Sequence, residues 1–339
     1  MTVDKLNEGS LVAYLRGRGL LEQGEAGEVR KLTGGYINVV FRLFRAAPGS
    51  DLIVKQSYEK SERTVLTADI ARAAVETRVM RGLKEWIGED CPTPTVIDED
   101  AERHAVIMSA APRDAVNYDD ELQQGVVRPG VGKLIGAYLA DLHNATEKRP
   151  ELAADLSHNP GFALRETSIR SILARNPDLE DIVDRAFWLN RCAASVLVDS
   201  DLTPKNVLVH GSEITKLDFE CAQWGHPALD VGVVLAHYML HAVANPAQSG
   251  PLLAEAADCV ERYTATRGGA DEPEFVRWAA NYTALMMLGR CDGDLILDLV
   301  RTRRRFVNSI SRWLLIEPVS EWDDVLAQLH KYAALSLPG

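Results

Sequence analysis

The sequence predicts an α+β protein with two lobes. Strand signals and one long helix occupy the first third of the chain, helical periodicity dominates the rest, and one short hairpin interrupts the helical part. Small residues at 109–112 predict a linker, which divides the chain into an N-terminal lobe (1–111) and a C-terminal lobe (112–339) with a cleft between them.

The N-terminal lobe is expected to hold a sheet and one helix. Short runs rich in β-branched or aromatic residues, bounded by Gly, Pro and Asp, predict strands. An apolar period of 3.6 without proline predicts a helix. The predicted strands cover 29–32, 39–44, 52–56, 93–97 and 105–108, and the predicted helix covers 67–87.

The C-terminal lobe is expected to be mostly helical, because apolar stripes at helical spacing recur along it. A hairpin lies among these stripes, with strands over 207–209 and 214–219 and a polar turn at 210–212. The predicted helices cover 131–142, 180–198, 228–244, 251–266, 273–290 and 294–315.

Composition restricts the class of protein. The 339 residues are 46% apolar and 25% charged, with a net charge of −12, which argues against a nucleic-acid partner. Apolar runs stay shorter than a membrane span, and the first residues lack a signal core. Five widely spaced cysteines without a C-x-x-C pair fit free thiols. We therefore expect a cytoplasmic protein that binds no membrane; a homodimer is left open.

The hairpin carries the residues with the most informative chemistry. Asp201 precedes Asn206 by five positions, and Asp218 follows at the end of the second strand. Glu220 lies two residues further on, on the same side of an extended chain, where it is a candidate for a second metal or a water. Two carboxylates and an amide oxygen at one end of a hairpin suit Mg²⁺ and a proton-accepting base for phosphoryl transfer. A surface turn would explain the Asp, Thr, Pro and Asn of 201–206, but not Asp218.

Three residue groups in the N-terminal lobe fit the same chemistry. Lys55 ends an apolar strand, and Glu76 lies in the middle of the next helix, an order that suits a phosphate-binding lysine with a carboxylate partner. Gly34 and Gly35 permit a turn whose N–H groups face a phosphate. Each also has a structural alternative: a solvent-facing lysine, a solvated glutamate and an ordinary hairpin turn. Asp230, at the start of an apolar helix, is expected to hold the catalytic loop backbone.

These segments together resemble the aminoglycoside phosphotransferase and choline kinase-like superfamily, and within it the methylthioribose kinase branch. The resemblance rests on Asp201–Asn206, on Asp218–Gly232 with its Asp-x-Glu and Trp-Gly-x-Pro elements, and on Thr33–Arg42, Val54–Gln56 and Leu66–Glu76. It is specific over about 30–245 and weaker after residue 246.

The resemblance implies a protein-kinase-like fold and an enzyme that moves the γ-phosphoryl group of ATP, with Mg²⁺, to a hydroxyl of a small molecule. It also implies a set of residue roles. Asp201 would accept the proton, Asn206 and Asp218 would bind metal, Lys55 and Glu76 would form the phosphate-binding pair, Gly34 and Gly35 would cover the phosphates, and Ser109 to Ala111 would form the nucleotide-binding hinge.

One departure from the family pattern stands beside Asp201. The family usually has His-Gly before the catalytic aspartate, and this chain has Asp199-Ser200. The extra carboxylate makes a non-catalytic nucleotide-binding relative an alternative. For an active enzyme, a sugar-like acceptor of the methylthioribose type is preferred over an antibiotic whose phosphorylation gives resistance. A protein kinase is disfavoured, because no Ala-Pro-Glu segment or long activation loop follows Asp218.

Overall fold

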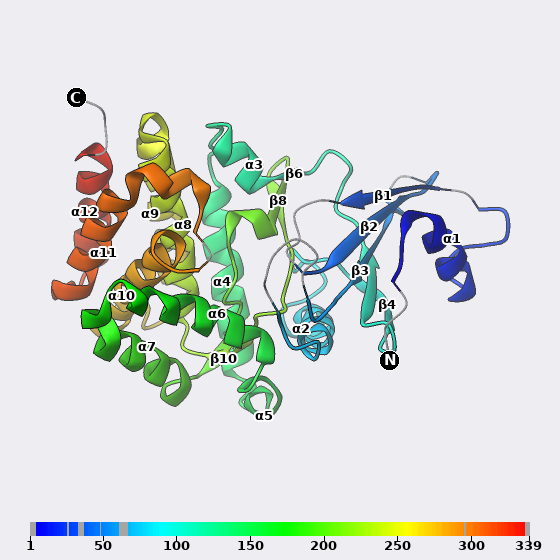
Figure 1. Ribbon diagram of the computed structural model, residues 1–339, viewed down its shortest axis with the longest axis horizontal. Coiled ribbons are helices and arrows are strands. Elements are labelled where there is room, and N and C mark those ends of the chain that lie inside the picture. The colour runs from blue at the N-terminus through cyan, green and yellow to red at the C-terminus, as the bar shows by residue number, and fades with distance from the viewer. Residues whose placement is uncertain are drawn as a thin grey trace.

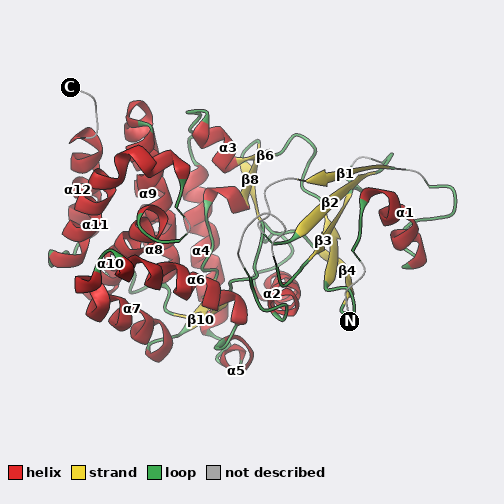
Figure 2. Cartoon of the chain, in the orientation of Figure 1, coloured by secondary structure: helices red, strands yellow, loops and turns green. Residues whose placement is uncertain are grey.

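The computed structural model describes residues 5–25, 27–32, 37–47, 49–60, 67–294 and 296–335. Two lobes lie side by side along the longest axis of the molecule (Figure 1). The larger sheet belongs to the smaller lobe, and helices make up most of the other (Figure 2). The α+β class with two lobes is therefore confirmed, and the boundary after residue 111 stays a prediction.

The N-terminal lobe is built on a five-stranded antiparallel sheet in the order β1-β2-β3-β5-β4. The strands are β1 Glu28–Leu32, β2 Val39–Phe44, β3 Leu52–Gln56, β4 Val96–Asp100 and β5 Ala105–Ser109. The predicted strand over 93–97 begins only at Val96, since Pro94 has no N–H to donate to a ladder.

The two faces of this sheet pack against different helices. Leu52 and Val54 of β3 point to one face and form a core with Leu11 and Leu15 of helix α1 (Glu8–Gly17). Because successive strand residues alternate between faces, Lys55 points the other way, toward the second helix. That helix, α2 (Arg72–Trp86), is shorter than the predicted 67–87. The sheet therefore presents Lys55 on the face that α2 covers.

Ten helices are described in the C-terminal lobe, and one of them is buried almost throughout. Helix α8 (Ala228–Ala244) matches its predicted range and packs against α9 and α10, as its predominantly apolar sequence requires. The other described helices are α3 Tyr118–Gln123, α4 Val131–Glu147, α5 Leu152–Leu156, α6 Pro160–Arg170, α7 Glu180–Cys192, α9 Ser249–Thr266, α10 Pro273–Cys291, α11 Arg304–Ile316 and α12 Trp322–Leu335.

Two predicted helices of the C-terminal lobe were also too long. The helix expected over 180–198 ends at Cys192. Residues Val196–Val198 instead form strand β7, which pairs with β10 (Gln223–Gly225), because the β-branched Val196 and Val198 favour a strand. The helix expected over 294–315 is split, with a 3₁₀ turn at Asp298–Arg303 before α11.

Short strands in the C-terminal lobe bring two loops together. β8 (Val207–His210) and β9 (Glu213–Lys216) form the predicted hairpin, and β6 (Val116–Asn117) pairs with β8. The second strand was predicted through residue 219 but ends at Lys216, since the backbone at Asp218 is left-handed, with a φ of 69°, and Asp218 and Glu220 lie in a loop. The loop over 199–206 lies between β7 and β8, and the segment 217–222 lies between β9 and β10. The Leu217 N–H donates to the Asn206 carbonyl at 2.8 Å, so the two loops are adjacent.

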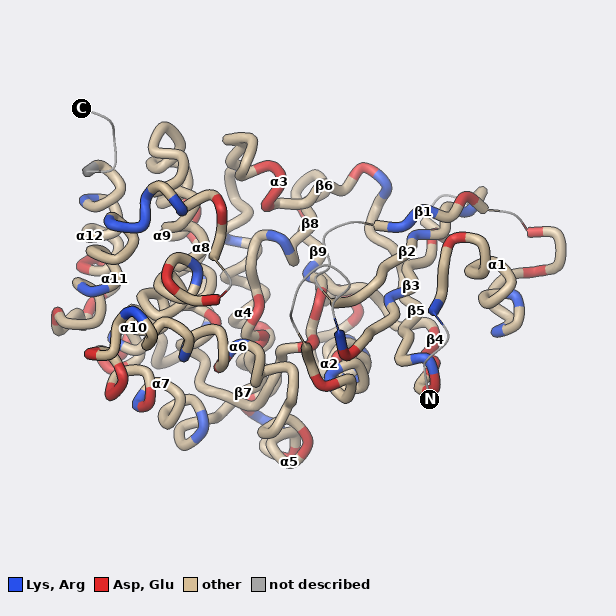
Figure 3. Tube along the Cα trace, in the orientation of Figure 1, with Lys and Arg blue, Asp and Glu red and all other residues tan. Residues whose placement is uncertain are grey.

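Charged residues of both signs are interspersed over both lobes (Figure 3). Within the described part of the chain, none of the helices combines the length and the apolar character that crossing a bilayer demands.

Candidate active site

Asp201 lies on the loop between β7 and β8, and both of its carboxylate oxygens are bound. Oδ1 accepts a hydrogen bond from Arg165 Nη2, and Oδ2 accepts one from Asn206 Nδ2 at 2.9 Å. Lys205 Nζ lies 3.5 Å from Oδ2. Burial alone would raise the pKa of Asp201, but the cations of Lys205 and Arg165 hold it well below the usual range. The carboxylate is therefore ionised and able to accept a proton.

Asn206 has the orientation that a metal ligand needs. Its Nδ2 donates to two acceptors, the Asp201 carbonyl and Asp201 Oδ2, both at 2.9 Å. Because both partners accept, the amide nitrogen must face them, and Oδ1 points away from Asp201. The proton-acceptor role of Asp201 and the metal role of Asn206 stay predictions.

Lys55 of the N-terminal lobe contacts one carboxylate from each lobe. Its Nζ lies 2.7 Å from Glu76 Oε1 on α2 and 2.8 Å from Asp218 Oδ1 beyond β9. Burial disfavours the ammonium, yet Asp218 and Glu76 outweigh burial and raise the pKa of Lys55. Burial likewise opposes ionisation of Asp218, and the Lys55 cation lowers the pKa of that carboxyl. Lys55 and Glu76 therefore form the predicted pair, with Asp218 as a third member.

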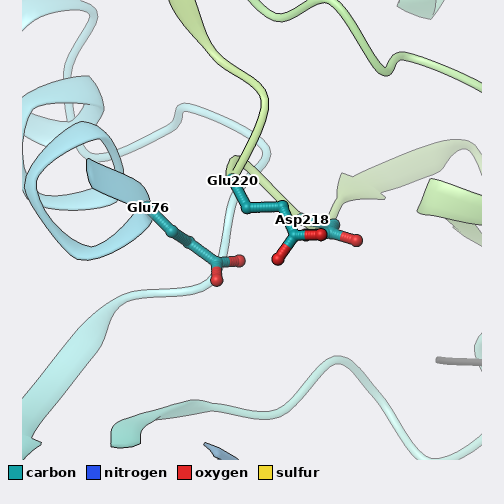
Figure 4. Close-up of side chains that lie close together, drawn as sticks. All are labelled: Glu76, Asp218 and Glu220. Carbon is teal, nitrogen blue, oxygen red and sulfur yellow. The ribbon is translucent and has the colours of Figure 1, made fainter. Parts of the chain in front are cut away.

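Three carboxylates converge where the lobes meet. Oxygens of Glu76, Asp218 and Glu220 lie within 4.8 Å of one another. Figure 4 shows Glu76 extending from α2 toward the other two side chains, which come from the segment after β9. Hard oxygen donors at this spacing, with the Asn206 amide on the neighbouring loop, fit Mg²⁺. Asp218 has a φ of 69°, a left-handed conformation that aspartate tolerates better than most residues.

Glu220 has a structural partner as well as a place in this cluster. Its Oε2 accepts hydrogen bonds from Asn38 Nδ2 at 2.9 Å and from Arg72 Nε at 3.0 Å. Both bonds reach across from the N-terminal lobe. The metal role of Glu220 stays a prediction, and one of its oxygens already ties the lobes together.

The hinge and glycine predictions have different outcomes. Ser109 ends β5, where its N–H donates to the Thr95 carbonyl and its Oγ accepts from the Thr95 N–H, each at 2.9 Å. The Ala111 carbonyl accepts from Arg42 Nη2 at 2.9 Å. Their cofactor role stays a prediction. Gly34 and Gly35 lie outside the described residues.

The expected role of Asp230 is confirmed. Its two carboxylate oxygens accept the N–H groups of Asp199 at 2.8 Å and Ser200 at 2.7 Å. His143 Nε2 lies 3.1 Å from the same carboxylate, fully buried. Asp230 therefore fixes the backbone that leads into Asp201.

Arg165, Lys216 and Arg72 were not predicted as members of the site. Arg165 lies on α6, where buried polar residues such as Ser168 interrupt the apolar period that would have marked the helix. Lys216 occupies a buried position of β9. The sequence offered one signal for it, since the unexpected carboxylate of Asp199 would need a positive partner if it were buried. Arg72 opens α2, and its partner Glu220 is 148 residues away.

Comparison with known proteins gives consistent relatives. The family described as phosphotransferase enzyme family matches residues 28–258. A methylthioribose kinase from Cronobacter sakazakii is 25% identical over 297 residues, covering 74% of this chain and 69% of that protein. A 4-hydroxytryptamine kinase from Psilocybe cubensis is 25% identical over 296 residues, covering 76% and 79%. The solved choline kinase from Cryptosporidium parvum has a TM-score of 0.59 at 12% identity, covering 95% of this chain and 100% of that one.

Proposed function

The chain belongs to the phosphotransferase enzyme family and is a small-molecule kinase, and we propose that it transfers the γ-phosphoryl group of ATP to a hydroxyl of a sugar-like acceptor of the methylthioribose type. One observation carries the proposal. A buried, ionised Asp201 is bound to Asn206, on a loop bonded to the segment whose Asp218 contacts Lys55 at 2.8 Å.

Asp201 supplies the base for this reaction. The acceptor oxygen attacks the γ-phosphorus, the bond from that phosphorus to the β–γ bridging oxygen breaks, and ADP leaves with the electron pair. The hydroxyl proton passes to the Asp201 carboxylate. Because the pKa of Asp201 is low, this proton moves late, after most of the new P–O bond has formed.

The remaining residues hold the nucleotide in place. Lys55, oriented by Glu76 at 2.7 Å, reaches the phosphates from the N-terminal lobe. Asp218 and the Asn206 amide oxygen would bind Mg²⁺, with Glu220 as a further oxygen ligand. Bound there, the metal neutralises charge on the phosphates. Orientation and charge stabilisation then account for most of the rate gain.

The acceptor class is argued from the relatives and from the sequence motifs. The named methylthioribose kinase and 4-hydroxytryptamine kinase are equally similar to this chain at 25% identity. The sugar-like acceptor is preferred because the motifs at 33–42 and 218–230 resemble the methylthioribose kinase branch.

An ADP-release assay with a panel of acceptors tests the proposal. The panel holds methylthioribose, other free sugars, 4-hydroxytryptamine, choline and an aminoglycoside. We expect release with a sugar and a loss of roughly 10²- to 10⁴-fold in Asp201→Asn, which cannot accept the proton. The exposed carboxylate variant Asp178→Asn is the control. Release with the aminoglycoside alone would favour the antibiotic-modifying alternative. Magnesium-dependent ATP binding without transfer to any acceptor would favour the non-catalytic one.

A further inference from the structure

A buried ion pair lies directly beneath the two loops of the site. Lys216 Nζ lies 3.0 Å from Asp199 Oδ2, and both side chains are completely buried. Desolvation of two charges costs free energy, so a buried pair is weak evidence for a stabilising role by itself. The other contacts of the two side chains show what the pair holds in place.

Lys216 uses all three of its donors on the two loops. Besides Asp199, its Nζ donates to the Leu217 carbonyl at 2.6 Å and to the Asp218 carbonyl at 2.9 Å. An ammonium has three N–H donors, so this set saturates it. The same cation lies 4.4 Å from the centre of the Phe219 ring. Lys216 therefore holds the backbone around Asp218, the residue with the left-handed φ of 69°.

Asp199 completes the connection to the base. Its Oδ1 accepts the Asp201 N–H at 3.1 Å, and its Oδ2 also accepts from the Tyr138 hydroxyl at 3.3 Å. A continuous path of three contacts runs from the Asp218 carbonyl through Lys216 and Asp199 to the Asp201 N–H. The path joins the backbone of the candidate metal ligand to the backbone of the candidate base.

We infer that Asp199 and Lys216 are a positioning pair, which fixes the Asp218 loop relative to Asp201 so that metal-bound nucleotide and base are aligned. The inference rests on the proposed function. It accounts for Asp199-Ser200 in a place where the resembling family has His-Gly. Neither side chain touches substrate in this assignment, and both act through backbone groups of the residues that do.

The test separates positioning from stability. Asp199→Asn, Lys216→Met and the double variant are compared with Glu255→Gln, a buried carboxylate that instead binds the N–H groups of Gly130 and Gly132. Replacing both charges removes the desolvation cost together with the attraction, but the Leu217 and Asp218 carbonyls lose their donor. We therefore expect the double variant to stay folded and to melt below wild type. If Lys216→Met does not fold, Asp199→Asn still tests the pair, because it removes one of the two charges and keeps Lys216.

The decisive readout is magnesium-linked nucleotide binding, which needs no acceptor and no turnover. Calorimetry gives the affinity for a non-hydrolysable ATP analogue with and without Mg²⁺. We expect the affinity gained from Mg²⁺ to fall about 10- to 100-fold in the double variant, with magnesium-free affinity unchanged. With an acceptor that the enzyme phosphorylates, we expect the double variant to have a lower kcat and an unchanged KM for the acceptor.

The inference would be overturned by a folded double variant that gains as much affinity for the analogue from Mg²⁺ as wild type does and has the same kcat. The two charges would then only compensate each other, without positioning the loops. A wild-type protein without any magnesium gain would instead refute the proposed function on which the inference rests. Wild-type behaviour of Glu255→Gln is the expected result for the control, and an equal loss there would also count against positioning.

Discussion

Asp201 is held by more cations than a simple base requires. Arg165 Nη2 binds one oxygen, while Asn206 and Lys205 approach the other. An acceptor hydroxyl must therefore share or displace one of these contacts. Arg165 is the natural candidate, because Asn206 is already proposed as a metal ligand and Arg165 is not. The cations of Lys205 and, next to it, Arg165 also lower the pKa of Asp201.

Arg165→Met tests that electrostatic role through the pH dependence of kcat/KM. Arg165 lowers the pKa of Asp201, so its loss moves that pKa up toward the ordinary value. The acid limb of the profile is expected to move to higher pH by roughly one to three pH units. Arg170→Met is the matched control, since Arg170 lies on the same helix and binds Glu166 and Asp184 instead. An unmoved acid limb would contradict the assignment.

At the scale of elements, Arg72 connects helix α2 to both lobes. It is fully buried and donates to the side chains of Glu220 and Asn38 and to the carbonyls of Ala68, Asp69 and Tyr58. A guanidinium has five N–H donors, and these five acceptors match all of them. The start of α2 is thereby fixed against the segment that follows Asp218.

Arg72→Met should be among the most destabilising substitutions in the chain. It leaves the partly buried Glu220 carboxylate without its cation, and losing one member of a buried pair costs about 3–5 kcal/mol. Urea denaturation measures the loss. The control is Arg78→Met on the same helix, where the pair with Asp155 is exposed and is worth about 1 kcal/mol at most. Equal losses for the two variants would show that the Arg72 network adds nothing.

A second cluster fixes the ends of β2 and β3. The buried Asp51 carboxylate accepts hydrogen bonds from Arg42, from Arg113 and from the Arg45 N–H. Its hydrogen bond with Arg113 is the largest cause of a pKa held well below the usual range. Since the Ala110 N–H donates to the Asp51 carbonyl, this cluster also anchors the predicted hinge.

Asp51→Asn should lower the free energy of unfolding by about 1–3 kcal/mol at pH 7. The folded-state pKa of Asp51 is depressed, so its stabilisation is complete above the unfolded value of about 3.9 and fades as pH falls below it. The difference in free energy of unfolding between wild type and variant should therefore become smaller from pH 6 to pH 3, as measured by urea denaturation. The exposed Asp271→Asn serves as the control; a constant gap would contradict the linkage.

Sequence proximity explains which parts of the site could be predicted. Asp201, Asn206 and Asp218 flank one short hairpin, so strand alternation and the turn are enough to place them at the same end of it. Arg165 and Arg72 meet their partners across 36 and 148 residues, and such contacts leave no local signal. The helix predicted through 198 failed because pairing with β10 outweighed helical periodicity for Val196–Val198.

At the scale of the whole molecule, the lobes share one apolar core, which includes Met80 and Leu83 of α2, and charged contacts join them as well. Lys55 contacts Asp218 at 2.8 Å, and Arg72 and Asn38 contact Glu220 at 3.0 and 2.9 Å. Each contact joins the N-terminal lobe to the short segment after β9. A nucleotide bound with Mg²⁺ would add ligands on both sides of this junction, so its binding should stabilise the two lobes together.

Thermal melting with a non-hydrolysable ATP analogue tests this coupling. A ligand at about 100 times its Kd adds about 2.7 kcal/mol to the stability of the state that binds it. In wild type, Mg²⁺ with the analogue should raise Tm further than the analogue alone, because the metal increases affinity. In Asp218→Asn, a neutral amide replaces the carboxylate that would hold the cation, so the increment from Mg²⁺ should vanish while that from the analogue persists. Glu147→Gln, whose carboxylate pairs with Arg267 elsewhere in the C-terminal lobe, should keep the full increment. If Mg²⁺ raised the Tm of Asp218→Asn as much as that of wild type, the metal would bind elsewhere. The only role left for the Asp218 carboxylate would then be its ion pair with Lys55.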